Sequence, residues 1–356
     1  MDKIINVGLI GFGIGGQIFH APFISGVKGL NLAKIRAAKE AQVASASEHY
    51  PNAQIVPQTE DILNDDSIGL VVISTPNTSH HPLAKAAILA GKHVVLDKPF
   101  TLNTVEADEL IALAVEHGKI LTVYHSRRFD SDFRTVQKLL KNGLLGTLVE
   151  FESHYDRFRN FFKPGAWREE DQPGAGILFD LGSHLIDQAL VLFGLPESVY
   201  ADLRIQRKDA RVTDNFDLVL NYPGLKVTLK AGMLVREALP RFTLLGDQGS
   251  FIKYGLDVQE EALKKGHNPI SHSTGWGVEP IAIWGKLNTD INGIHFVGNI
   301  ESETGNYTSF YQNVYDVIVK KAELFVKPTE ARNTMRIIEL AVQSNVEKAV
   351  VPYSFK

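Results

Sequence analysis

In the first third of the chain, short apolar runs alternate with longer amphipathic segments. The apolar runs, which are typical of buried strands, cover residues 4–10, 30–37, 69–74, 92–96 and 119–124. Segments with the length and composition of helices cover residues 17–27, 79–90 and 103–116. Strands that alternate with helices predict a right-handed, doubly wound, mostly parallel α/β sheet.

From residue 125 onward, strand-like runs joined by short turns dominate the pattern. These runs cover residues 146–158, 198–206, 215–221, 226–233, 242–246 and 250–254. Short connections such as Tyr222-Pro223-Gly224 join antiparallel neighbours. We therefore expect a first α/β domain at residues 1–124 and a second, α+β domain at residues 125–356. The second is built on an open, mainly antiparallel sheet, and a helix at about 328–347 is expected to pack back on the first.

A glycine turn between the first strand and the first helix is the most specific local pattern. Three glycines have the spacing G-x-G-x-x-G that is typical of dinucleotide binding in a Rossmann domain. The first permits a tight turn, the second lets the backbone approach a pyrophosphate, and the third allows close helix–strand packing. The helix N-terminus then offers N–H groups to the phosphates. The turn residues expected to bind the cofactor are Gly11, Phe12, Gly13, Ile14, Gly15 and Gly16.

The end of the second strand favours NADP over NAD. Dinucleotide folds normally carry Asp or Glu there, to bind the ribose hydroxyls of the adenosine. This chain has Arg36 and Lys39 instead, and cations pair with a 2′-phosphate that a carboxylate would repel. Alternatively, both side chains are solvated charges at a strand end. NAD then remains an alternative cofactor, because an acidic residue, Glu40, is nearby.

Two further strand ends carry polar residues at the edge of the sheet where cofactors bind. The third strand leads into Thr75, Pro76 and Asn77, with His80 close behind, and these residues could contact the nicotinamide ribose. An Asx turn and a helix cap would explain Asn77 and His80 equally well. The next strand ends in Asp97 and Lys98, where a surface lysine before a turn proline is the alternative.

One helix of the second domain, expected at residues 177–193, has a polar stripe on an otherwise apolar surface. Asp180, His184 and Asp187 are spaced i, i+4 and i+7, which places them on one face. Such a stripe needs water, partners or a ligand. Alternatively, Asp180 caps the helix and Asp187 is the partner of a core histidine. We expect no metal site, because no further ligands have a suitable spacing.

Composition excludes several classes of function. The net charge is −4, and no run of basic residues indicates nucleic-acid binding. There is no cysteine, which excludes disulfides and thiolate chemistry and fits a reducing cytoplasm. The chain enters its first strand directly, without a signal peptide, and no apolar run has the length of a membrane span.

Taken together, the motifs resemble the glucose–fructose oxidoreductase/inositol dehydrogenase/MocA family over essentially the whole chain. The resemblance rests on GFGIGG, on TPNTSHHPLAKAAILAGKHVVLDKP and on GAGILFDLGSHLID. The stretches FHAP, SRRFDSDF and YDRFR are similar to a branch with NADP-dependent scyllo-inositol dehydrogenases. Where this chain has Asp97, the family usually has Glu, a difference that affects the surroundings of the lysine more than the chemistry.

The resemblance implies a catalytic set of Lys98, Asp180 and His184. His184 would accept the proton of a secondary hydroxyl while hydride leaves to the nicotinamide, since an imidazole titrates near neutral pH. Lys98 would stabilise the developing negative charge on the oxygen, and Asp180 would orient the histidine or bind a neighbouring hydroxyl. Tyr155, Arg157 and Trp167 could line the substrate pocket, although an edge-strand surface position would also explain them.

The resulting expectation is an NAD(P)-dependent dehydrogenase that acts on an inositol-like polyol or a sugar. Two alternatives are an NAD-dependent glycosidase, which this family also contains, and a non-catalytic dinucleotide-binding regulator. A non-catalytic regulator would be expected to lack the lysine or the histidine, whereas this chain has both Lys98 and His184. An open sheet with helices on one face also predicts a homodimer or homotetramer.

Overall fold

Six parallel strands form the sheet of the first structural unit, in the order β3-β2-β1-β4-β5-β6. This is the strand order of a Rossmann fold. The central strands β1 and β4 are almost entirely buried, as expected of a parallel sheet covered on both faces. The strands are β1 (Ile5–Ile10), β2 (Leu30–Arg36), β3 (Gln54–Val56), β4 (Ile68–Ile73), β5 (His93–Leu96) and β6 (Leu121–Val123).

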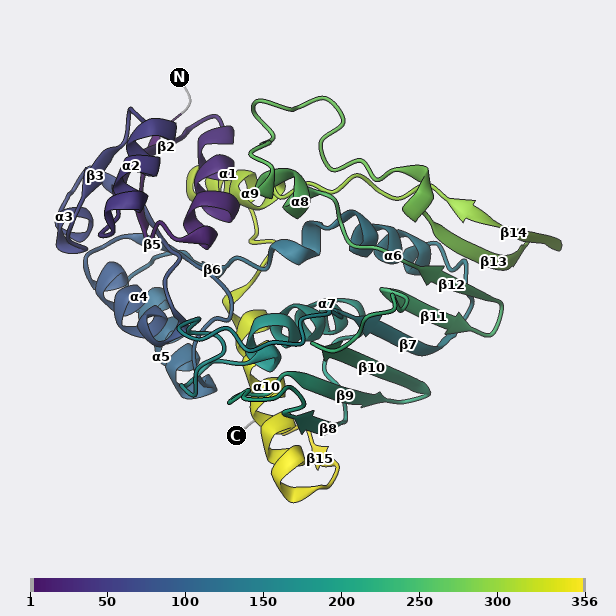
Figure 1. Ribbon diagram of the computed structural model, residues 1–356. Helices are drawn as coiled ribbons and strands as arrows, with labels where there is room; N and C mark the ends of the chain where they lie inside the picture. Colours follow the sequence, from purple (N-terminus) through teal and green to yellow (C-terminus); the bar gives the residue numbers. More distant parts are fainter. Residues whose placement is uncertain (1–2, 355–356) are drawn as a thin grey trace. The chain divides into compact units, whose positions relative to one another are not determined.

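Helices follow most of these strands, as the apolar periodicity predicts (Figure 1). The helix after β1 begins with a π-helical segment, η1, and continues as an α-helix. Asn103 caps α5 by accepting a hydrogen bond from the backbone N–H of Glu106 at 2.9 Å. The helical segments are η1 (Gly15–His20), α1 (Ala21–Gly26), α2 (Glu40–His49), α3 (Glu60–Leu63), η2 (Asn77–Ser79), α4 (His80–Leu89) and α5 (Thr104–Glu116).

The computed structural model describes residues 3–354, which divide into two compact units. The first consists of residues up to 126 together with 259–276 and 306–332, and the second contains the rest. Residues 259–276 and 306–327 were expected in the second domain, but they belong to the first unit, on which their aromatic side chains pack. Phe310 and Tyr311 of α9 (Thr308–Lys320) pack on Tyr124, and Trp276, which follows α8 (Gln259–Lys264), packs on Phe23.

Helix α10 (Pro328–Glu347) was expected to pack back on the first domain. Its first residues, to Arg332, belong to the first unit, where Arg332 pairs with Asp108 of α5 at 2.9 Å. The remainder belongs to the second unit, where Ser344 accepts a hydrogen bond from the backbone N–H of Ala201. The helix thus continues from one unit into the other.

The second unit is built on a nine-stranded sheet in the order β14-β13-β12-β11-β7-β10-β9-β8-β15. All neighbours are antiparallel except β7 and β10, which run parallel. Strands β13, β14 and β15 were not anticipated, and the first strand is shorter than the expected run at 146–158. The strands are β7 (Leu148–His154), β8 (Ser198–Arg204), β9 (Asn215–Tyr222), β10 (Leu225–Gly232), β11 (Phe242–Gly246), β12 (Gly249–Lys253), β13 (Gly285–Ile291), β14 (Ile294–Ile300) and β15 (Val351–Pro352).

Helices α6 (Ser131–Lys141) and α7 (Ser183–Phe193) lie along one face of this sheet (Figure 1). Phe193 of α7 packs on Phe151 of β7, with ring centroids 5.2 Å apart. Leu218 and Leu229 are fully buried, whereas their neighbours Val219 and Thr228 point to the opposite, partly exposed face. The apolar side chains that alternate along these strands thus face the helices.

Candidate functional site

The glycine turn after β1 has the geometry that its sequence predicts. Gly11 has a φ of 101°, and a Cβ atom there would lie 2.2 Å from the carbonyl oxygen of Ser74. A Cβ atom on Gly16 would lie 2.2 Å from the carbonyl oxygen of Gly11. Gly13, in contrast, has open space where its Cβ would be. The turn is therefore closed toward the protein at Gly11 and Gly16 and open at Gly13, which fits the close approach of a pyrophosphate.

The two cations expected to favour NADP lie at the end of β2 and just after it. Arg36 is the last residue of β2, and its Nε donates to the carbonyl of Pro57 at 3.3 Å. Lys39 precedes α2 and is exposed. Arg36 is partly exposed and Lys39 is exposed, so both cations could pair with an incoming phosphate.

The turn after β4 is tied to the turn after β5 by His80. The ring of His80 is fully buried, with Nδ1 at 2.8 Å from the carbonyl of Pro99 and Nε2 at 3.0 Å from the carbonyl of Thr75. Burial lowers the pKa of His80, although Asp97 opposes this effect. Asn77 is also buried, whereas Thr75 is partly exposed and accepts a hydrogen bond from Ser79. His80 thus connects the two loops, one after β4 and one after β5, at the carboxyl edge of the sheet.

Asp97 and Lys98 directly follow β5, and the peptide bond from Lys98 to Pro99 is cis. The Asp97 carboxylate accepts hydrogen bonds from the backbone N–H of Lys98 at 2.8 Å and from the hydroxyl of Ser74 at 3.2 Å. A third polar contact comes from His20 Nε2, 3.4 Å from Oδ2. Burial alone would raise the pKa of Asp97, but His20 and Lys98 outweigh it and hold this pKa well below its usual range.

In the second unit, Asp180 and His184 lie where a π-helical turn changes into an α-helix. Asp180 belongs to η4 (Leu178–Gly182), and His184 is the second residue of α7. Such π-helical turns often occur at functional sites, because they redirect side chains relative to a regular helix. His184 is 8% exposed, and its ring lies 6.2 Å from that of Tyr155. Asp187 is bound by Arg128 through two hydrogen bonds of 2.8 and 2.6 Å, so it serves the packing of this helix.

The loop before η4 places an arginine against Asp180. Nε of Arg168 lies 3.3 Å from Oδ1 of Asp180, and its guanidinium stacks over Trp167 at 4.5 Å. The backbone N–H of Gly176 donates to the carbonyl of Arg168, which fixes the loop to the start of the helix. Glu169, which is almost fully buried between Arg159 and Arg207, anchors the same loop.

Tyr155, Arg157 and Trp167 have different environments. The ring of Tyr155 is 5% exposed, its hydroxyl lies 3.4 Å from Asp130, and burial raises its pKa well above the usual value. Arg157 is exposed, and its backbone pairs with Gly232 and Val235. Trp167 is partly exposed under Arg168.

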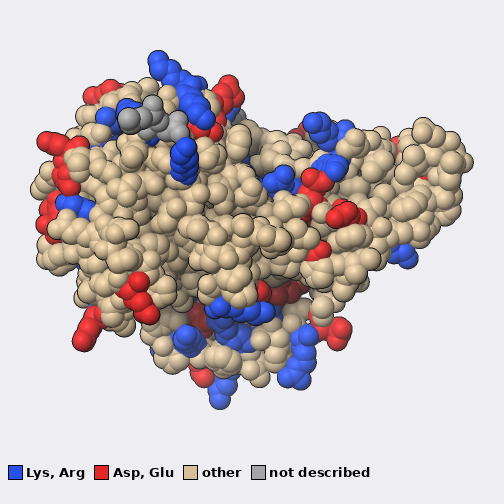
Figure 2. All heavy atoms as spheres, turned by 90° about the horizontal axis from the view of Figure 1, so that it is seen from above, with Lys and Arg blue, Asp and Glu red and all other residues tan. Residues whose placement is uncertain are grey.

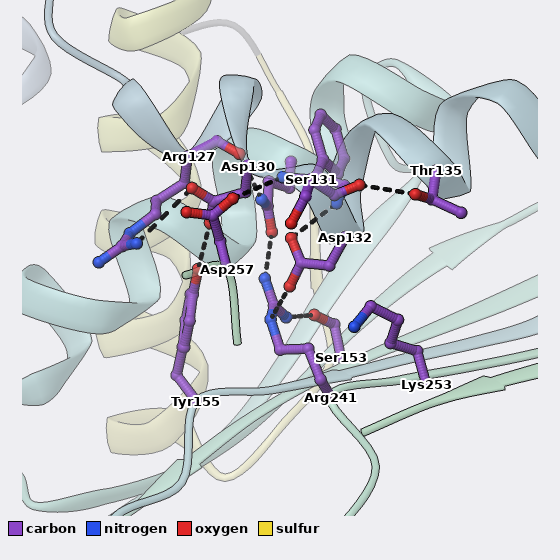
Figure 3. Close-up of polar contacts among 12 residues, drawn as sticks. Arg127, Asp130, Ser131, Asp132, Thr135, Ser153, Tyr155, Arg241, Lys253 and Asp257 are labelled. Atoms are coloured by element: carbon purple, nitrogen blue, oxygen red, sulfur yellow. Dashed lines mark hydrogen bonds and ion pairs between the residues drawn. The ribbon is translucent and has the colours of Figure 1, made fainter. Parts of the chain in front are cut away.

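A buried network holds Tyr155 and α6 on the sheet (Figure 3). Arg241 stacks on Tyr155 at 4.0 Å, pairs with Asp132 at 3.2 Å and donates to Gln188 at 2.7 Å and to Ser153. Gln188 in turn donates to the carbonyl of Arg127. Because every one of these groups is buried or nearly so, the network fixes the segment that precedes α6 relative to α7.

Within residues 3–354, no cluster of three or more His, Asp or Glu side chains could hold a metal ion. No helix in the same range combines the length and apolar character needed to cross a membrane. On the face shown in Figure 2, basic and acidic side chains are interspersed.

Comparisons with known proteins define the class and then the family. A family model described as an oxidoreductase family with an NAD-binding Rossmann fold matches residues 5–125, and the GFO/IDH/MocA C-terminal domain matches residues 133–252. The chain is therefore an oxidoreductase with an NAD-binding Rossmann domain. It belongs to the GFO/IDH/MocA family.

Several relatives match over nearly their whole length. The uncharacterized oxidoreductase YdgJ of Escherichia coli is 42% identical, with 99% of both chains covered. The scyllo-inositol 2-dehydrogenase (NADP(+)) IolW of Bacillus subtilis is 38% identical, with 98% of this chain and 95% of that protein covered. The solved structure of yvaA from Bacillus subtilis is 37% identical and superposes with a TM-score of 0.94 over 99% of both chains.

Three residues around the site were missed by sequence reasoning. His20 lies within the FHAP stretch, which carried a resemblance but no assigned role, and Arg168 directly follows Trp167. His20 could have been noticed as a polar residue of a quoted motif, and Arg168 as the neighbour of a predicted pocket residue. Arg241 is different, because nothing local to the sequence indicates that a residue at the start of a strand is buried beneath Tyr155.

Proposed function

We propose that this oxidoreductase transfers hydride between a nicotinamide and a secondary hydroxyl of a polyol or sugar of the inositol type. The observation that carries the proposal is the π-helical turn that presents Asp180 and His184 on an otherwise buried apolar helix. Lys98, at the carboxyl end of a strand of the dinucleotide-binding sheet, supports it. IolW, named for its action on scyllo-inositol, adds a substrate class consistent with these groups.

In this proposal each residue has one task in the oxidation of the alcohol. When bound, the nicotinamide supplies the hydride acceptor. His184 accepts the hydroxyl proton, a task that suits an imidazole near neutral pH. Lys98 donates to the same oxygen and stabilises its developing negative charge. Asp180, fixed by Arg168, binds a neighbouring hydroxyl of the polyol or orients the imidazole.

We further propose that NADP is the preferred cofactor. The turn residues Gly11 to Gly16 bind the pyrophosphate, and Arg36 and Lys39 bind the 2′-phosphate. Phe12 and Ile14 complete that turn. Thr75, Pro76, Asn77, Asp97 and Lys98 belong to the loops proposed to face the nicotinamide half. His80 contributes by holding two of those loops together.

The remaining substrate contacts are proposed on the second unit. Trp167 offers an aromatic face to the C–H groups of a sugar ring, and Arg157 offers an exposed guanidinium. Tyr155 lies against His184, and its burial suits a role in shaping the pocket.

A homodimer or homotetramer formed through the second unit is also part of the proposal. Strand β14 ends the nine-stranded sheet and exposes apolar side chains, with Ile294 at 72% and Val297 at 49% exposure. The end of the β13–β14 hairpin carries few charges, as the tan region at the right of Figure 2 indicates. An uncovered apolar edge of this kind favours association. A cytoplasmic location stays a prediction from the cysteine content.

A substrate panel tests the proposed reaction directly. The protein is incubated with NADP or NAD and with scyllo-inositol, myo-inositol, glucose or xylose, and the absorbance of reduced nicotinamide is recorded. The proposal predicts reduction with at least one inositol or aldose. Tightly bound NAD with no net NADH formation, together with cleavage of an aryl glycoside, would instead identify a glycosidase. Cofactor binding without any turnover would identify a regulator.

A further inference from the structure

We propose that His20 is a positioning residue that connects the cofactor turn to Lys98 through Asp97. His20 ends the π-helical segment η1, which begins within the glycine turn. Its ring is fully buried and therefore contacts no ligand directly. The inference rests on the proposed role of Lys98.

His20 lies in a chain of three polar side chains that come from three distant parts of the sequence. Its Nδ1 is 2.6 Å from the hydroxyl of Tyr311, which is fully buried on α9. Its Nε2 is 3.4 Å from Oδ2 of Asp97. Because a carboxylate can only accept, the contact with Asp97 is favourable when Nε2 carries the proton of the ring, and Nδ1 can then accept from the Tyr311 hydroxyl. Tyr124 packs against the imidazole at 4.6 Å and restricts its rotation.

Asp97 transmits this constraint to Lys98. One carboxylate oxygen faces His20 and Ser74, while the other accepts the backbone N–H of Lys98. The orientation of the Asp97 carboxylate therefore sets the backbone from which the Lys98 side chain projects.

The cofactor turn touches the same carboxylate. A Cβ atom on Gly15 would lie 2.5 Å from the hydroxyl oxygen of Ser74 and 3.1 Å from Oδ2 of Asp97. Gly15 lies outside the G-x-G-x-x-G spacing, so the dinucleotide motif alone does not explain it. Close approach to Asp97 does explain it, because the turn can rest on the Asp97 carboxylate only if residue 15 lacks a side chain. His20 and Gly15 thus enclose Asp97 from the same segment, η1.

The short side chain of Asp97 fits this arrangement. An aspartate carboxylate stays close to its own backbone, where it accepts the following N–H, as Asp97 does with Lys98 at 2.8 Å. His20 contacts the other carboxylate oxygen, Oδ2, at 3.4 Å. We infer that His20 and Asp97 act as a pair in this chain.

The test separates the polar contact between His20 and Asp97 from the packing of the His20 ring. In His20→Gln, the amide nitrogen can replace Nε2 as a donor to Asp97, whereas in His20→Asn the shorter side chain reaches only the position of Nδ1. Tyr311→Phe removes one hydroxyl that contacts His20. Tyr315→Phe, one helical turn further along α9, removes a hydroxyl that bonds to the carbonyl of Lys3 at 3.0 Å and serves as the matched control.

Two measurements are made on the full-length protein. The first is amide hydrogen exchange at Lys98, which needs no substrate. We expect His20→Asn to exchange roughly tenfold faster or more, as for a weakened hydrogen bond to a charged group, while His20→Gln and Tyr315→Phe match the wild type. The second is turnover of the best inositol, where His20→Asn lowers kcat by roughly 10- to 100-fold with little change in the Kd of NADP. Tyr311→Phe gives a smaller loss of the same kind.

Unchanged hydrogen exchange at Lys98 in His20→Asn would overturn the inference. Equal losses of kcat in His20→Asn and His20→Gln would overturn it as well. Either result would mean that His20 contributes by packing alone. Should the wild type oxidise no compound of the panel, the proposed function fails, and hydrogen exchange still decides whether His20 positions Lys98.

Discussion

Arg168 and Asp180 form an ion pair, with Nε and Oδ1 3.3 Å apart, at the start of the helix that carries His184. The arginine side chain is 51% exposed and the aspartate 23%, so the pair lies at the surface of its unit. Arg168 also stacks on Trp167, and the two contacts together hold the guanidinium in one orientation. The loop therefore directs the Asp180 carboxylate without burying it.

We expect Arg168→Met to lower kcat/KM for the best polyol by roughly tenfold, because Asp180 loses the contact that orients it. The free energy of unfolding should change by less than about 1 kcal/mol, the usual value of an exposed ion pair. Arg211→Met is the matched control, since Arg211 is 59% exposed, pairs with Glu170 at 2.7 Å and stacks on Phe162. Equal kinetic losses in both variants would argue against a specific role of Arg168.

The double variant Arg36→Ala, Lys39→Ala should bind NADP at least about tenfold more weakly, because each lost charge-assisted hydrogen bond to the 2′-phosphate is worth about 1.5–3 kcal/mol. The affinity for NAD should change little, since NAD lacks that phosphate, and NAD thus serves as the internal control. Fluorescence titration with each cofactor measures both constants. Tighter binding of NAD than of NADP by the wild type would remove the proposed preference.

Lys253 and Glu279 form a fully buried ion pair with an N–O distance of 2.8 Å, and Glu279 also accepts a hydrogen bond from Ser131 at the start of α6. We expect Lys253→Met to lower the free energy of unfolding by about 3–5 kcal/mol, because it leaves a buried carboxylate without its cation. Adding Glu279→Gln should recover a large part of this loss. Urea unfolding of both variants provides the test, and a loss below about 1 kcal/mol in Lys253→Met would contradict the expectation.

His93 should make stability depend on pH in a defined window. Burial, assisted by the positive charges of Lys119 and Lys3, lowers its pKa to about 4, while its Nδ1 accepts the backbone N–H of Ile120. In the unfolded chain the pKa is about 6.5. Its contribution is therefore complete above about pH 6.5 and declines as the pH falls toward 4, since only the unfolded chain takes up the proton there.

His93→Asn keeps an acceptor for Ile120 but cannot be protonated. We expect its urea midpoint to fall less between about pH 7 and pH 5 than that of the wild type. His117→Asn, which replaces an exposed histidine after α5, is the control and should follow the wild type. A His93→Asn protein with the same pH dependence as the wild type would show that His93 does not titrate as expected.

The first unit was largely predictable because its signals are local. The apolar runs gave β1, β2, β4 and β5 to within one or two residues, since strands buried on both faces are continuously apolar. The glycine turn was predictable for the same reason: steric contacts at Gly11 and Gly16 permit no other residue. The helix predicted at residues 103–116 corresponds to α5, whose N-cap is Asn103.

The features that were missed depend on contacts between distant parts of the chain. Strands β13 and β14 carry little of the apolar alternation that identifies a half-buried strand, because β14 lies at the edge of the sheet with most of its residues exposed. The π-helical turn at Asp180 has no sequence signature of its own. His20 contacts Tyr311, 291 residues further along the chain, and no spacing rule relates such positions.

The central claim is that His184 accepts the proton when a polyol hydroxyl is oxidised, with Lys98 stabilising the same oxygen. The most direct measurement is the turnover of the best inositol by His184→Ala and Lys98→Ala, with NADP affinity and circular dichroism recorded on the same samples. We predict folded proteins that bind NADP normally and turn over roughly 10²–10⁴-fold more slowly, the range for a positioned acid or base. For His184→Ala, the fall in rate at low pH should also disappear. A folded, NADP-binding His184→Ala protein that oxidises the polyol at nearly the wild-type rate would contradict the account.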